Sequence, residues 1–475
     1  VGARSQREAT TGEFNTSLGS LSMGVGVVTG DANVAVGYNA GSALTSGIKN
    51  ILIGKDAGDS LTEGNFNIAI GTDALQTEDT HGKNIAIGHA ALELLNAGAD
   101  GNNVAIGYNS GAAMTTGVNN TIVGGLAGDA MTTGFDNVFV GKNSGGSATI
   151  GNNNVGIGLN ALGTNVGGDR NVAIGSDALA AMTSATTADT YNTAIGFMAG
   201  AAVTTGTKNV LVGGLAGDAL TTGEYNVALG QNALSAEDTG SRNVAIGFEA
   251  LRDLNYDGNS YNAAIGWQAG VLMTTGIKNT IIGGLAGDAL TTGGQNVVMG
   301  YLALSTEDTG SKSIAIGTSA LKTQNYDGDA YNVAIGHDAG KGVTTGVKNT
   351  ITGGLAGDAI TDGNENTAYG YASLSGEDSG VSNTAIGTQA LGTQDGGDAN
   401  VAVGRQAGLN ISTGDNNTVI GGNAGDALTT GDNNIIIGKN AAASAVDVDN
   451  ETVIGTTTTT SALVHGLKQP VIAAS

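Results

Sequence analysis

A five-residue motif, Asn-Val-Ala-Ile-Gly or a close variant, recurs along the chain, usually at a spacing of seventeen residues. Between Asn15 and Glu451 there are 26 copies, with Gly in the fifth place of every copy and Asn in the first place of 24. Such self-similarity is typical of solenoids, in which each coil needs only its neighbours for burial. The sequence therefore predicts an all-β solenoid of about 26 coils over residues 15–455, with 1–14 as an N-terminal junction or cap and 456–475 as a non-repeat tail.

The coil that begins at Asn33 shows why this repeat favours β-structure. Residues 33–36 have β-branched side chains at alternating places, which indicates a short strand. Gly37 permits a turn that a Cβ would disfavour. A second apolar stretch follows at 40–44, and 45–47 closes the coil. Glycines every few residues make a helix improbable, so we expect two or three short strands per coil, with the first-place Asn residues stacked in a ladder that satisfies backbone groups.

The strand also predicts partner chains. Val34 and Val36 point to one side and Ala35 to the other, and several coils are apolar on both sides: Ile51-Leu52-Ile53, Val138-Phe139-Val140, Val210-Leu211-Val212, Val297-Val298-Met299 and Ile435-Ile436-Ile437. A seventeen-residue coil has only one interior, so the second face is expected to pack on another chain. Alanine on that face would allow close approach about an axis, which favours a homotrimer or another cyclic oligomer. A single-chain solenoid with a covered face is the alternative.

A longer period is superimposed on the coils. The ninth residue of each coil alternates in blocks between Gly and Leu, which defines a superrepeat of four coils, about 70 residues. The last Leu coil of a superrepeat often carries extra residues, two after Leu92, Leu251 and Leu321 and four after Leu179. We expect these insertions to bulge outward, because a stacked core has no room for them. Two of them contain the segments Asn255-Tyr256-Asp257-Gly258 and Asn325-Tyr326-Asp327-Gly328.

Composition excludes several classes of function. The formal net charge of −24 argues against nucleic acid as a partner, and no apolar run approaches the ~18–20 residues of a membrane span. There is no cysteine, and the four histidines stand apart rather than at ligand or triad spacing. We therefore expect no cofactor, no metal site and no catalytic residue.

Two groups of carboxylates are candidate sites. Glu-Asp pairs recur at 78–79, 237–238, 307–308 and 377–378; a glycosidase would need two carboxylates across a cleft, whereas adjacent residues point apart, which favours solvated turns. The Gly-Asp motifs at Asp59, Asp129, Asp218, Asp288, Asp358 and Asp426 are superficially similar to calcium-binding β-roll repeats. They recur once per superrepeat, so adjacent coils could not share an ion.

Aromatic residues are the candidate surface contacts. Several follow the fifth-place Gly, among them Tyr38, Tyr108, Trp267, Tyr301 and Tyr371, and two more, Tyr256 and Tyr326, lie in the insertions. They could stack on the sugar rings of a cell-surface glycan, or they could cover the solenoid corner or a subunit joint. Threonine pairs such as Thr115-Thr116 raise an ice-binding alternative, but they are confined to the Gly coils.

The motif N-[VT]-A-[IV]-G followed by Ala or Ser resembles the head repeats of trimeric autotransporter adhesins. Its fuller form, as in residues 192–196 with Ala199-Gly200 and Thr204-Thr205-Gly206, is similar to bacteriophage tail-fibre proteins. This second resemblance implies a Thr-rich stretch, here 456–460, before a self-cleaving C-terminal chaperone that trimerises the fibre. It would make Ser475 the mature end left by the cut.

Together these features predict a non-enzymatic, homotrimeric fibre of a phage virion that joins other virion proteins and contacts a host-surface glycan or protein. The alternative is an adhesin of the trimeric autotransporter type on a bacterial surface. A polysaccharide depolymerase that uses the acidic pairs is less favoured.

Overall fold

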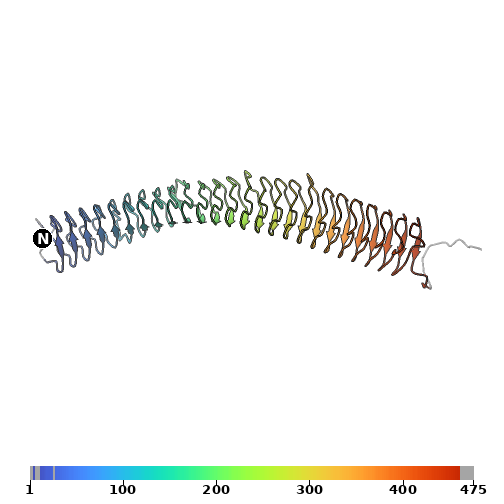
Figure 1. Cartoon of the computed structure of the whole chain (residues 1–475). Helices are drawn as coiled ribbons and strands as arrows, with labels where there is room; N and C mark the ends of the chain where they lie inside the picture. The colour runs from blue at the N-terminus through green and yellow to red at the C-terminus, as the bar shows by residue number, and fades with distance from the viewer. Residues whose placement is uncertain (1–3, 6–10, 25–26, 460–475) are drawn as a thin grey trace, which may run out of the picture. The chain divides into compact units, whose positions relative to one another are not determined.

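The computed structural model describes residues 4–5, 11–24 and 27–459, and its secondary structure there is entirely strand and turn. It divides into two compact units, 1–261 and 262–475. Each unit is a β-solenoid in which short parallel strands stack as a ladder along one side of the coils (Figure 1).

The described residues of the first unit form fourteen coil strands and one small extra sheet. The coil strands are β1 (Thr16–Leu18), β2 (Val34–Val36), β3 (Ile51–Ile53), β4 (Ile68–Ile70), β5 (Ile85–Ile87), β6 (Val104–Ile106), β7 (Thr121–Val123), β8 (Val138–Val140), β9 (Val155–Ile157), β11 (Val172–Ile174), β13 (Thr193–Ile195), β14 (Val210–Val212), β15 (Val227–Leu229) and β16 (Val244–Ile246). The extra parallel pair, β10 (Gly168–Asp169) with β12 (Ala188–Asp189), is formed where the coil after Leu179 has its four additional residues.

In the second unit, residues 262–459 are described and form twelve coil strands. They are β17 (Ala263–Ile265), β18 (Thr280–Ile282), β19 (Val297–Met299), β20 (Ile314–Ile316), β21 (Val333–Ile335), β22 (Thr350–Thr352), β23 (Thr367–Tyr369), β24 (Thr384–Ile386), β25 (Val401–Val403), β26 (Thr418–Ile420), β27 (Ile435–Ile437) and β28 (Thr452–Ile454). Within each unit a strand pairs in register with the same places of the next coil, as Val34 does with Ile51. The repeat and its period are thus confirmed.

The expectation of two or three strands per coil is wrong for most coils, which have one strand of three residues; among the described residues only the coils of β9 and β11 have a second strand, β10 and β12. The rest of the coil turns repeatedly through left-handed backbone. In the coil of β2, the φ angles are 60° at Asn39, 55° at Gly41 and 58° at Lys49. A strand needs a negative φ, so these positions break the chain into turns that still hydrogen-bond from coil to coil.

The interior of each coil is filled from three places. The middle residue of the strand, the eighth residue and the twelfth residue point inward, and in the coil of β2 these are the fully buried Ala35, Ala40 and Leu44. Val34 and Val36 face outward and are half-buried. This reverses the expected orientation, in which Ala35 would lie on the outer face. The reason is volume: a seventeen-residue coil is thin, so the inward place of the strand is most often Ala, and a larger residue such as Leu52 is buried there where the turn opposite has Gly58.

The alternation of Gly and Leu follows the size of the inward strand residues. A Cβ on Gly41 would lie 2.5 Å from Leu52 Cδ1, and a Cβ on Gly58 would lie 2.8 Å from Leu52 Cδ2. Leu52 thus fills the space beside the glycine of its own coil and of the coil before it. Where the strand has Ala69 instead, the ninth place is filled by the buried Leu75.

The asparagine ladder is confirmed and its chemistry is specific. Asn50 is fully buried; its Oδ1 accepts a hydrogen bond of 2.9 Å from the Asn67 backbone N–H, and its Nδ2 donates to the Gly64 carbonyl at 2.8 Å. The same side chain thus satisfies the next coil and its own closing turn. The fifth-place Gly is equally constrained, since a Cβ on Gly37 (φ 138°) would lie 2.3 Å from the Gly54 carbonyl oxygen.

Candidate functional site

The broadest surface feature is an apolar stripe made by the first and third residues of the strands. These outward side chains are mostly Val, Ile and Thr, and they keep substantial exposure, as Ile435 does at 42%. Because every coil contributes two of them, the stripe runs along the strand face of each unit. The sequence-based expectation of a second apolar face is confirmed, although β-branched residues rather than alanines form it.

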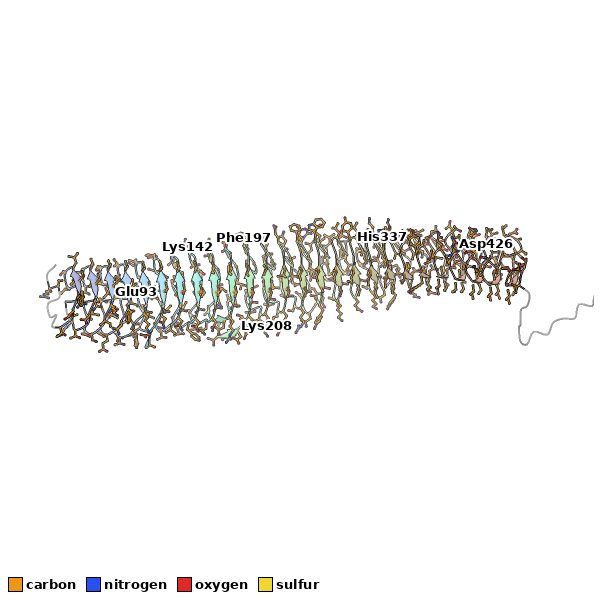
Figure 2. The ribbon with its side chains drawn as sticks, turned by 90° about the horizontal axis from the view of Figure 1, so that it is seen from below. Glu93, Lys142, Phe197, Lys208, His337 and Asp426 are labelled. Atoms are coloured by element: carbon orange, nitrogen blue, oxygen red, sulfur yellow. The ribbon has the colours of Figure 1, made fainter. Side chains whose placement is uncertain are left out.

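The residue after the fifth-place Gly lies along one edge of that stripe. Phe197 and Lys142 project from this edge in Figure 2, whereas Lys208, which precedes a strand, projects from the opposite edge. Tyr38, Tyr108, Trp267, Tyr301 and Tyr371 occupy the same place of the repeat as Phe197 and are all more than half exposed. They are therefore accessible in the single chain, as a contact role requires.

Each superrepeat after the first interrupts this edge with a glycine, and we call this place without a side chain a slot. At Gly284 a Cβ would meet only Tyr301 Cδ2, at 3.7 Å, and the Trp267 carbonyl oxygen, at 3.9 Å. The coil before each such glycine presents a flat side chain, namely Tyr108, Phe197, Trp267, His337 or Arg405. The structure thus brings Trp267 and Tyr301 to the two sides of one slot, two coils apart.

The loop tyrosines belong to a different place in the repeat. Tyr256 and Tyr326 are partly buried within insertions whose other residues are largely exposed, so the predicted outward bulge is confirmed. In the second unit a shallow hollow is lined by Asp308, Asn325, Tyr326, Asp327 and Thr345. The loop is held by Thr309, whose Oγ1 donates to Asp327 Oδ1 at 2.7 Å.

The acidic pairs are not solvated turns, because the Glu of each pair is fully buried: Glu78, Glu237, Glu307 and Glu377. Glu237 Oε1 accepts from the Gly240 N–H at 2.7 Å, and its Oε2 accepts from the Tyr256 N–H at 3.3 Å in the next coil. The carboxylate is therefore an internal anchor for the inserted loop. A sequence signal existed, since these Glu residues occupy the twelfth place, which is apolar in most other coils.

Burial changes the protonation of these carboxyl groups. Burial raises the pKa of Glu237 to about 7, helped by the nearby Asp238 carboxylate and opposed by the N–H groups of Gly240 and Tyr256. The pKa of Glu377 is also raised by burial, against the hydrogen bonds it accepts from Gly396, Gly380 and Ser379. Since their oxygens accept hydrogen bonds from backbone N–H groups inside the coil, these carboxylates stabilise the fold and are not exposed to a substrate.

Two of the four anchors have further ionisable side chains close by. One group consists of Glu78, Asp79 and His81, and the other of Glu377, Asp378 and Asp395. A hydrogen bond with Asp378 raises the pKa of Asp395, which indicates that these two carboxyl groups are in contact. Either group has the ligand types that a cation would use, but each Glu already accepts backbone hydrogen bonds.

Sequence reasoning missed the residue just before each first-place Asn. This residue has a left-handed φ between 48° and 64° in all 26 coils. Eight of the 18 basic residues occupy it: Lys49, Lys83, Arg170, Lys208, Arg242, Lys278, Lys312 and Lys348. In a chain of net charge −24, this concentration at one place of the repeat was visible in the sequence but needed an alignment of the coils to be noticed.

No protein-family model matches this chain, and a search of curated proteins found no significant match. In the described part of the chain, no helix has the length and apolar character to cross a membrane. The predicted processing end, Ser475, lies outside the described residues. The class of protein that the fold defines is therefore a repetitive parallel β-solenoid.

Proposed function

We propose that this chain is a structural, non-enzymatic fibre that assembles as a homotrimer, belongs to a phage virion and contacts a host-cell surface. The observation that carries the proposal is the outward apolar stripe. Monomeric soluble proteins rarely expose contiguous apolar patches above a few hundred Å². Two outward, mostly apolar side chains per coil, at a coil rise of ~4.8 Å, make a much longer patch in each unit.

Three copies around an axis would bury this stripe while leaving the opposite faces in solvent. The regular register supports this geometry. The two outward places of each coil pair with the same places of the next coil, as Val210 does with Val227. A cyclic interface reuses one patch on every copy. In such an assembly the outward side chains of the three copies would interdigitate at every coil along the interface.

The exposed aromatic edge is the surface offered for host contact. The slot between Trp267 and Tyr301 has a glycine floor and a flat aromatic wall, a shape that suits the apolar face of a sugar ring. Slots with at least one aromatic neighbour also occur at Gly125, Gly214 and Gly354, and they would make weak contacts many times over. Linked weak sites bind with an avidity above that of any one site.

Two alternatives rest on the same observations. An adhesin on a bacterial surface would use the same trimeric solenoid, and electron microscopy of the native source would separate it from a virion fibre. A depolymerase would need open carboxylates, whereas Glu237 and Glu307 are buried and bound to backbone N–H groups. Release of oligosaccharides from incubated glycans would overturn the non-enzymatic proposal.

The assembly is tested by light scattering on the full chain and two matched triple variants. Ile53→Asp, Ile106→Asp and Ile195→Asp place three charges on the stripe at exposed positions. Thr116→Asp, Thr133→Asp and Thr222→Asp place the same charges at exposed positions off the stripe. We expect three times the chain mass for the wild type and the Thr variant, and a smaller species for the Ile variant. A monomeric wild type would refute the assembly.

A further inference from the structure

Before successive first-place Asn residues, cations and tyrosines alternate coil by coil through the end of the first unit. The run is Arg170, Tyr191, Lys208, Tyr225, Arg242 and Tyr261. In the second unit the same place has Lys278, Gln295, Lys312, Tyr331, Lys348 and Glu365. We call the segment Lys208, Tyr225, Arg242 and Tyr261 the cation–tyrosine ladder.

The tyrosine rings of the ladder orient the charged groups of Lys208 and Arg242 by cation–π contacts. Lys208 Nζ lies 4.7 Å from the centroid of the Tyr225 ring and 2.8 Å from its hydroxyl oxygen. Arg242 Cζ lies 5.2 Å from the Tyr225 centroid and 5.8 Å from the Tyr261 centroid. Cation–π contacts of this kind orient a charged head without neutralising it. Tyr261 is 51% exposed, so the ladder remains open to solvent.

The charges in this segment form no direct ion pair. Elsewhere in the same column Arg170 pairs with Asp189, Lys312 with Asp329 and Lys348 with Glu365. Within the described residues, Lys208 and Arg242 instead donate to neutral groups, the Tyr225 hydroxyl and Asn259 Oδ1, and the Glu224 carboxylate acts on Lys208 only through space. Two oriented cations without a carboxylate in direct contact form a local site for an anion.

The backbone at these positions has the conformation that this place has in every coil. Lys208, Tyr225 and Arg242 have left-handed φ angles of 59°, 59° and 64°. The repeated conformation directs the side chains of successive coils to the same edge, so the types of side chain at this place decide the chemistry of that edge.

Spacing selects the kind of anion. Cations recur every second coil, which at ~4.8 Å per coil places them ~10 Å apart. Phosphates of a nucleic acid duplex follow each other at ~3.4 Å along a strand, far more densely than these cations. In an extended polysaccharide, a disaccharide unit has a length comparable with two coils.

We propose that the cation–tyrosine ladder binds a linear acidic polysaccharide that carries one carboxylate on every second sugar. Consecutive carboxylates accept hydrogen bonds from Lys208 and Arg242, and the Tyr225 and Tyr261 hydroxyls hydrogen-bond the neutral sugars between and beside them. This inference deepens the proposed function, on which it rests, by naming the chemistry of the surface that the fibre contacts.

Hyaluronan is a suitable probe because its carboxylates recur once per two sugars. Polygalacturonate, charged on every sugar, and uncharged dextran are the comparison polymers. Binding to the full chain would be measured by calorimetry at low and at physiological salt. We expect hyaluronan to bind best, dextran not to bind, and affinity to fall as salt rises.

A matched pair of double variants assigns the binding. Lys208→Gln with Arg242→Gln should weaken hyaluronan binding roughly tenfold, from two exposed charge contacts of ~0.7 kcal/mol each. Lys55→Gln with Lys142→Gln removes the same charge from the place after the fifth-place Gly, on the opposite edge of the strand face, and should change it little. Tyr225→Leu should lower affinity severalfold while both charges remain. Equal losses in the two double variants would overturn the inference.

The outcomes separate this inference from the proposed fibre. A wild-type trimer that binds host cells but not hyaluronan or polygalacturonate would overturn the ladder and leave the fibre standing. Loss of the trimer in Lys208→Gln with Arg242→Gln would place the ladder in the subunit interface, which also overturns it. A monomeric wild type whose hyaluronan binding depends on Lys208 and Arg242 would support the ladder and refute the fibre.

Discussion

Two superrepeats, one in each unit, place the same buried glutamate in different surroundings. Glu237 and Glu307 both accept a 2.7 Å hydrogen bond from a glycine N–H within their own coil and a 3.3 Å bond from the tyrosine N–H of the inserted loop. They differ in the next coil, where Glu307 faces Gln324 and the corresponding residue for Glu237 is Leu254.

The amide of Gln324 connects several groups that leucine cannot. Its Nε2 donates to Glu307 Oε2 at 2.9 Å and to Ser313 Oγ at 3.0 Å, and its Oε1 accepts from Asn332 Nδ2 at 2.9 Å. This network also explains why Ser313 replaces the usual first-place Asn, since the glutamine amide enters the coil at that point. A buried carboxylate is therefore tolerated in two ways: by a polar network, or by a raised pKa as in Glu237.

The largest expected loss of stability follows from replacing the buried glutamates themselves. Glu307→Leu leaves the N–H groups of Gly310 and Tyr326 and the Gln324 amide without their acceptor, and we expect a local loss of about 3–5 kcal/mol. Glu237→Leu should cost less at neutral pH, because it also removes a carboxyl that is costly to ionise. Coils of a solenoid open locally, so hydrogen exchange of the Gly310 and Gly240 amides is the measurement. Equal losses would contradict the comparison.

Stability should depend on pH in the coils around Glu237. Its folded pKa of about 7 exceeds its ordinary value of 4.5, so the folded state favours the protonated carboxyl. The resulting stability is fully present below about pH 4.5 and is lost as pH rises through about 7, by at most about 3 kcal/mol. Denaturant unfolding followed at several pH values would show the slope, and Glu237→Gln should remove it. Local stability that rises over this range would contradict the assignment.

Gln324→Leu places a leucine beside Glu307, as Leu254 is placed beside Glu237. The Glu307 Oε2, Ser313 and Asn332 side chains each lose a hydrogen-bond partner, and we expect a loss of about 1–3 kcal/mol near neutral pH. Hydrogen exchange of the Tyr326 amide is the local measurement. An unchanged exchange rate would show that the network adds nothing to the anchor.

The reverse exchange, Leu254→Gln, gives Glu237 the neighbour that Glu307 has, and we expect a smaller effect on stability. A glutamine amide beside Glu237 favours the ionised carboxylate, so the pKa of Glu237 should fall, by an amount worth about 1 kcal/mol. The midpoint of the pH-dependent loss of stability should move to lower pH in this variant. A midpoint that stays at about 7 would mean that the next coil does not control the carboxyl.

The smallest expected effect concerns the loop side chains. Both anchors bind the tyrosine backbone N–H, so Tyr256→Ala and Tyr326→Ala should change stability by no more than about 0.5 kcal/mol. Thermal unfolding compared with the wild type is sufficient to test this. A larger loss in either variant would assign the ring a packing role that its partial exposure does not suggest.

Some features of the structure could be predicted from the sequence and others could not. The asparagine ladder, the fifth-place glycines and the outward insertions could all be predicted, because each depends on one residue type repeated at one place. The burial of Glu237 can be inferred only by comparing coils, because its place is apolar in most of them. The inward orientation of Ala35 could not be predicted, because it depends on how much volume a coil encloses.

The sequence by itself determined the repeat, its period and the presence of two apolar strand faces, because hydrogen-bonded stacking of identical coils follows from local periodicity. Only the tertiary structure decided which face is inside, which carboxylates are buried, and which side chains become neighbours from coil to coil. The alignment of Lys208, Tyr225 and Arg242 into a ladder belongs to this second group. It arises because residues seventeen or more positions apart in sequence come to lie one coil rise apart in space.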